Sequence, residues 1–133
     1  MERLSNSRTQ WVATTRPDGR PHVMVVWGVW LTDRFYFCTS ARSRKALNLA
    51  ANPKCVVCAE RSDETVVLEG VAEKITDPSL DREFKDTYRR KYEENADTNQ
   101  FPLYAVRPQV VFGFVSDPVK WAGSITRWRF RDG

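Results

Sequence analysis

The most constraining feature of this sequence is a segment, residues 21–31, that is apolar on both faces of a β-strand. Alternate side chains of a strand share a face. One face carries Val23, Val25, Trp27 and Val29, and the other carries Met24, Val26 and Trp30. Such a strand must be covered on both sides. A chain of 133 residues has few elements for this task, which predicts that one face is buried against a second subunit. Gly28 within the segment indicates a bulge or a close approach by another group.

β-Strand patterns dominate the rest of the chain. They occupy residues 11–16, 35–39, 54–59, 65–75, 103–107, 109–116 and 124–131. Two segments are helical instead: residues 43–52, with Ala46, Leu47 and Ala50 on one side, and the segment after Asp77 and Pro78, where Leu80, Phe84, Tyr88 and Tyr92 recur every fourth residue. The sequence predicts a mainly β (α+β) protein, a six- to seven-stranded antiparallel barrel with two covering helices, in one domain over residues 1–133.

Composition narrows the function classes only slightly. The net charge is +4, from 21 basic and 17 acidic residues, and no stretch approaches the length of a membrane span. Residues 1–8 lack the apolar stretch of a secretory signal, so we expect a cytoplasmic protein. The three cysteines do not form a disulfide framework. Cys55 and Cys58 have C-x-x-C spacing but lie on a predicted strand, where they face opposite ways, and we expect no metal site.

The most informative stretch for chemistry is residues 37–48, where a strand ends and a helix begins with Ser43 or Ser40 as its cap. The first turn of a helix has unpaired N–H groups and partial positive charge, so it attracts anions. Acidic side chains usually occupy this turn, whereas here Arg42, Arg44 and Lys45 do. A bound phosphate explains the cations. A solvated basic patch explains them too, and the residues alone leave both interpretations open.

The segment of residues 39–53, with the preceding residues 17–23, resembles the pyridoxamine 5′-phosphate oxidase-like superfamily of split β-barrels. In that family a Ser-Arg-Lys triplet at the helix start holds the FMN phosphate, and Ser43, Arg44 and Lys45 stand at that place. The chain is most similar to actinobacterial relatives that use the deazaflavin F420, through Lys45, Asn48 and residues 127–130. Residues 22–27 lack the arginine and lysine that contact phosphate in the classical FMN oxidases, which argues against pyridoxamine phosphate oxidase activity itself.

The resemblance implies further site residues. The cofactor ring is expected along the second and third strands, against Val25, Val26, Trp27 and Thr39, although Trp27 fits plain core packing equally well. The alternating end of the chain places Arg127 and Arg129 on one face, where they are candidates for a substrate or for the acidic tail of F420. The alternative for these arginines is an edge strand whose charges discourage aggregation.

The resulting functional hypothesis is an oxidoreductase that transfers a hydride between F420, or alternatively FMN, and a small organic substrate. The resemblance also implies a homodimer with the cofactor at the interface. No catalytic acid–base pair stands out, and His22 is expected at the surface. One alternative is a non-catalytic flavin-, deazaflavin- or haem-binding protein. A nucleic-acid-binding module, suggested by the pI of about 9.1, is disfavoured because the basic residues form only two short clusters.

Overall fold

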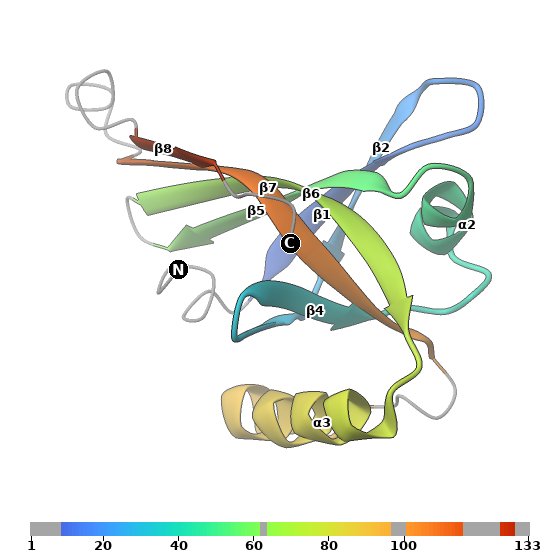
Figure 1. The fold of residues 1–133 in the computed structure, drawn as a ribbon, viewed down its shortest axis with the longest axis vertical. Helices are drawn as coiled ribbons and strands as arrows, with labels where there is room; N and C mark the ends of the chain where they lie inside the picture. Colours follow the sequence, from blue (N-terminus) through green and yellow to red (C-terminus); the bar gives the residue numbers. More distant parts are fainter. Residues whose placement is uncertain (1–8, 62–63, 97–100, 116–125, 130–133) are drawn as a thin grey trace.

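The computed structural model describes residues 9–61, 64–96, 101–115 and 126–129 (Figure 1). Its strands are β1 (Gln10–Thr15), β2 (Pro21–Val26), β3 (Val29–Leu31), β4 (Arg34–Cys38), β5 (Lys54–Arg61), β6 (Glu64–Ile75), β7 (Leu103–Val115) and β8 (Thr126–Arg129). Its helices are α2 (Arg44–Ala51) and α3 (Pro78–Tyr92). The mainly β class with two covering helices is confirmed. No helix among the described residues is long and apolar enough to cross a membrane.

The strands form a single antiparallel sheet in the order β2-β1-β5-β6-β7-β4-β3, and β8 pairs with β7 outside this path. The prediction of one strand over residues 21–31 is wrong, because the segment divides at Trp27 and Gly28. Its first half pairs with β1 and its second half with β4. The two ends of the path are therefore consecutive in the chain, and the sheet must curl until they meet.

Gly28 is the point where the curled sheet closes. A Cβ atom there would lie 2.2 Å from Cζ of Phe35 and 2.6 Å from the carbonyl oxygen of Tyr36, so only glycine fits. The backbone of Gly28 bonds to side chains instead of a strand. Its N–H donates to Oε1 of Gln10 (2.7 Å), and its carbonyl accepts from the hydroxyl of Tyr92 (2.6 Å) and Nζ of Lys91 (3.1 Å). The close approach expected at Gly28 is confirmed.

Tyr92→Phe tests this closure, because it leaves the Gly28 carbonyl with one donor fewer in a buried site. We expect a loss of about 1–3 kcal/mol in the free energy of unfolding, measured by urea denaturation. Tyr104→Phe is the control, because Tyr104 is also buried but belongs to the main core cluster, where its ring stacks on Phe37. Equal losses in the two variants would mean that the Tyr92 hydroxyl does not stabilise the closure.

Two sequence predictions need correction, one about the bounds of a strand and one about the buried face of a helix. The segments 103–107 and 109–116 form the single strand β7, because a register shift at Glu69 and Gly70 of β6 accommodates Pro108, which has no N–H to donate. In α2 the buried residues are Ala46, Asn48 and Leu49, whereas Leu47 is 47% exposed. The expected apolar side of α2 is therefore wrong, since the buried face includes a polar side chain.

The core fills the inner face of the curled sheet. A row of directly opposed residues, Val12, Val57, Leu68 and Val111, crosses four strands and is buried throughout. Helix α2 lies beside β1 and β2, and α3 lies beside β3 (Figure 1). The stripe expected on α3 is confirmed for Phe84, Tyr88 and Tyr92, which pack in a second apolar cluster, whereas Leu80 is half-buried outside it. The two helices thus flank the region where β2 ends.

Candidate cofactor-binding site

The start of α2 is held by a short chain of hydroxyl groups. Ser43 is the N-cap, and its Oγ accepts from the backbone N–H of Ala46 (3.1 Å). The hydroxyl of Thr39 donates to the same oxygen (3.0 Å), while the Thr39 N–H bonds to the carbonyl of Pro102 (3.2 Å). Of the two predicted caps, Ser43 and Ser40, the structure has Ser43. The first turn of α2 contains no acidic residue, so its partial positive charge is not offset within the turn.

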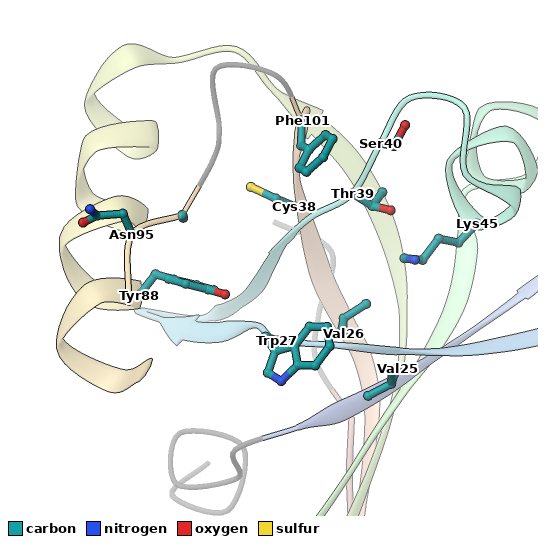
Figure 2. A pocket seen from close by; sticks show the side chains of 11 residues that line it. Val25, Val26, Trp27, Cys38, Thr39, Ser40, Lys45, Tyr88, Asn95 and Phe101 are labelled. Atoms are coloured by element: carbon teal, nitrogen blue, oxygen red, sulfur yellow. The ribbon is translucent and has the colours of Figure 1, made fainter. Parts of the chain in front are cut away.

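A cavity of about 320 Å³ opens beside this helix start (Figure 2). It lies between the end of β2, the end of β4, α2 and α3. Its lining residues are Val25, Val26, Trp27, Cys38, Thr39, Ser40, Lys45, Tyr88, Asn95, Ala96 and Phe101. Lys45 extends toward the cavity from α2, and the Tyr88 ring points into it from α3. The cavity therefore has a cation and hydroxyl groups at one end and aromatic rings on its other walls.

Positive charge accumulates next to this cavity. Lys45 is half-buried, and burial lowers its pKa. Neither Arg44 nor Lys45 has an ion-pair partner among the residues that the structure describes. Burial, with the charges of Arg16, Lys45 and Arg44, also lowers the pKa of His22. This cluster of four basic residues disfavours further positive charge and would be stabilised by an anion.

The structure brings together most of the predicted site residues. Val25, Val26, Trp27, Thr39 and Lys45 all line the cavity. Ser43 adjoins it through Thr39, and Arg44 lies exposed on the same turn without lining it. Asn48 lies elsewhere: it is 0% exposed, and its Nδ2 donates to the Thr14 hydroxyl (3.0 Å). Asn48 thus fixes α2 onto β1.

Several lining residues escaped the sequence analysis. Tyr88 belongs to the apolar stripe of α3, and nothing in that periodicity distinguishes a cavity wall from core. Cys38 and Ser40 are the chain neighbours of Thr39, so the position of Thr39 at the end of β4 brings them to the cavity too. Phe101 precedes β7 and carries no local signal. The hydrogen bond from the Thr39 N–H to the Pro102 carbonyl holds the neighbouring Phe101 at the cavity wall.

Arg127 and Arg129 are not brought to the cavity within one chain. Both are exposed on β8, and the Arg127 guanidinium lies over the ring of Phe112 at 5.5 Å. Figure 1 shows β8 at the end of the sheet remote from α2. A role for these arginines toward a substrate or a cofactor tail stays a prediction.

The cysteines give no indication of a metal centre. Cys55 is buried, with a pKa raised to about 12 by burial, and Cys58 is half-buried on the opposite face of β5. Among the described residues no group of three His, Cys, Asp or Glu side chains is placed to hold a metal ion.

Known proteins resemble this chain in sequence and in fold. The profile of the family described as pyridoxamine 5′-phosphate oxidase matches residues 1–115. A pyridoxine/pyridoxamine 5′-phosphate oxidase of Bacteroides thetaiotaomicron is 31% identical over 116 residues, which are 84% of this chain and 54% of the relative. A second such enzyme, from Cupriavidus necator, is 34% identical over 85 residues, 62% of this chain and 40% of the relative. The chain thus spans about half the length of the curated relatives it matches.

Solved structures share the fold at lower sequence identity. An F420 reductase has a TM-score of 0.69 and 24% identity, and the match covers 83% of this chain and 93% of the reductase. A conserved hypothetical protein of Mycobacterium tuberculosis has a TM-score of 0.78 and 21% identity, with 99% and 88% covered.

Proposed function

This chain belongs to the pyridoxamine 5′-phosphate oxidase family, and from that premise we propose that it is an oxidoreductase that holds F420, or alternatively FMN, in the cavity beside α2. The cofactor supplies the hydride chemistry when bound. The protein supplies the phosphate anchor, the walls that exclude water and the orientation of the ring. The substrate is a small organic molecule whose identity the site does not specify.

The observation that carries this proposal is the basic cluster at the start of α2. Arg44 and Lys45 lack ion-pair partners among the described residues, and the partly buried Lys45 lines the cavity. The Nδ1 atom of His22 is buried and has no hydrogen-bond partner in the described part of the chain. Buried polar atoms are usually paired. A phosphate with its several acceptor oxygens fits this set, because it would give each of these donors an acceptor.

The remaining walls suit a planar conjugated ring. Trp27, Tyr88 and Phe101 come from three separate segments and present aromatic surface, while Val25 and Val26 add an aliphatic wall. Such walls keep water away from a hydride donor. The hydroxyl of Thr39, fixed by its bond to Ser43, stands between the cation and these walls. The cavity can therefore receive the phosphate at its polar end and the ring at its aromatic end.

We favour F420 over FMN. β2 offers no arginine or lysine to a phosphate, unlike the pattern expected of classical FMN oxidases, so Lys45 and Arg44 carry the anchor. The solved structures with this fold include one described as an F420 reductase. Asn48 does not line the cavity and bonds to Thr14 of β1, so the choice of F420 does not rest on it.

A fluorescence titration of the purified protein with F420 and, separately, with FMN tests the proposal. We expect binding of F420 at least tenfold tighter than of FMN. The reduced cofactor is then mixed with the protein and candidate electrophilic substrates. Tight binding without any protein-dependent oxidation of the reduced cofactor would indicate a non-catalytic binding protein. The absence of binding to either cofactor would contradict the proposal.

We further propose that the protein is a homodimer, because one face of the sheet carries a row of apolar side chains that are only partly covered. On this outer face, Val25, Trp11, Cys58, Val67 and Phe112 form a continuous row of directly opposed residues. Trp11 is 40% exposed and Val23 is 57% exposed. Contiguous exposed apolar surface of this kind is typical of protein interfaces. Arg127 lies at the end of the same row, so any role in a cofactor site would involve a second copy.

Trp11→Glu tests the dimer, since it places a charge within the apolar row at a side chain that is exposed in one chain. We expect the wild type to sediment at about twice the 15.4 kDa chain mass and the variant to shift to monomer. Leu47→Glu, which replaces another exposed apolar residue on α2, should leave the dimer intact. A wild-type protein that is monomeric at all concentrations would contradict the proposal.

A further inference from the structure

His22 occupies an unusual position next to the proposed phosphate anchor. It lies on β2 directly opposite Thr14 of β1, and directly opposed residues share a face of the sheet. The Thr14 hydroxyl accepts from Asn48 of α2, so this is the face that α2 covers. The Nδ1 atom of His22 is buried there, and no described residue provides a hydrogen-bond partner. A buried imidazole nitrogen without a partner is a destabilising arrangement that calls for an explanation.

The charges that act on His22 are all positive. Arg16, at the end of β1, donates from Nη1 to the Pro21 carbonyl (2.8 Å) and so stays close to the start of β2. Helix α2 packs against β2, and the charges of its Arg44 and Lys45 act on His22. These cations and burial lower the pKa of His22, so the imidazole is neutral in the empty protein at neutral pH.

We propose that His22 is a further ligand of the cofactor's phosphate group and that it takes up one proton from solvent when the phosphate binds. This inference rests on the proposed function, because it needs a phosphate at Arg44 and Lys45. The anion reverses the local potential, and the imidazole becomes a cation whose two N–H groups both donate. The only bond formed is the new N–H bond of the imidazole, and one proton is taken up from solvent for each phosphate that binds. His22 acts here as a binding and positioning residue.

The sign of the resulting pH dependence follows from the direction of the pKa change. Below the pKa of free His22 the imidazole is charged in both states, and above the pKa of the complex it is neutral in both. Between the two values binding takes up a proton, so affinity falls as pH rises. A phosphate monoester such as FMN titrates near pH 6 in the opposite sense, whereas the phosphodiester of F420 does not titrate in this range. Subtracting the pH profile of affinity of His22→Gln from that of the wild type removes the contribution of the ligand's own titration.

NMR gives a direct test because His22 is the only histidine in the chain. The imidazole resonances of the full chain are followed against pH, first alone and then saturated with F420 or with FMN. We expect the ligand to raise the pKa of His22 by about 1–3 units. We also expect His22→Gln to lose about tenfold or more in affinity at pH 6 and little at pH 8, since one pKa unit corresponds to a factor of ten.

The outcomes separate this inference from the proposed function. Cofactor binding that depends on Lys45, with an unchanged pKa of His22, would overturn proton uptake at His22 and leave the phosphate anchor standing. Binding of neither cofactor would overturn both. A third outcome would also contradict the inference: the pKa of His22 rises in the wild type, but the difference in affinity between wild type and His22→Gln does not change with pH. Protonation of His22 would then make no contribution to affinity. The NMR measurement uses the wild-type protein, so it decides the question even if His22→Gln folds poorly.

Discussion

Gly28→Ala is expected to lower the free energy of unfolding by about 3 kcal/mol, because overpacking of a filled site typically costs 1–3 kcal/mol or more. The added methyl group would lie 2.2 Å from the Phe35 ring and 2.6 Å from the Tyr36 carbonyl oxygen. Phe35 is fully buried, and the backbone of β4 is fixed between β3 and β7. Neither neighbour can move without disturbing the core. Urea denaturation measures the loss.

Gly19→Ala is the matched control for this prediction. A Cβ atom at Gly19 would contact nothing within 4 Å, but its φ of +90° makes alanine unfavourable by roughly 1–2 kcal/mol. The difference between the two variants therefore reports the packing clash at Gly28. Because Trp27 adjoins Gly28 and lines the cavity, Gly28→Ala should also weaken cofactor binding, whereas Gly19→Ala should not. Equal stability losses would contradict the account of the closure.

The double variant Arg44→Ala/Lys45→Ala is expected to lose at least about 100-fold in cofactor affinity. A hydrogen bond to a charged group contributes roughly 1.5–3 kcal/mol, and each 1.4 kcal/mol is a factor of ten. Lys45 should account for the larger share, because it is half-buried and lines the cavity while Arg44 is exposed. Calorimetric titration of the single and double variants with the cofactor measures both shares.

The free energy of unfolding of this double variant should not fall with its affinity, and this contrast distinguishes a lost ligand contact from a damaged fold. Cations at the start of α2 oppose the partial positive charge of the helix, by about 0.3–1 kcal/mol each. Without cofactor the double variant should therefore unfold at the same or a slightly higher urea concentration than the wild type. Arg42→Ala, which removes an exposed cation just before the helix, should change affinity less than threefold. A loss of affinity in Arg42→Ala equal to that in Lys45→Ala would indicate a diffuse basic patch.

Local signals account for the parts of the fold and site that could be predicted. The caps at Ser43 and Asp77 follow from hydrogen-bonding side chains before apolar periodic segments. The cluster at Lys45 follows from cations in a turn that usually contains acids. Val25, Val26, Trp27 and Thr39 follow from the family resemblance and not from a local signal, and all four line one cavity.

The parts that failed depend on contacts between distant residues. The division of residues 21–31 is set by the closing of the sheet at Gly28, where Gln10 supplies the acceptor and Lys91 and Tyr92 supply the donors. No local pattern encodes such a meeting. Asn48 is a candidate through the family resemblance alone, and its bond to Thr14, 34 residues away in sequence, is likewise invisible to local patterns. Its role toward a cofactor stays a prediction. Phe101 reaches the cavity only because β4 and β7 are paired.

The most direct test of the central claim is to compare the affinity of the wild-type protein for each cofactor with and without its phosphate. FMN is compared with riboflavin, and F420 is compared with its phosphate-free deazaflavin core, by the same fluorescence titration. For whichever cofactor binds, we expect removal of the phosphate to weaken binding by at least about 100-fold. Most of this difference should disappear in Lys45→Ala. Equal affinity for the phosphorylated and phosphate-free compounds would contradict a phosphate anchor at the start of α2.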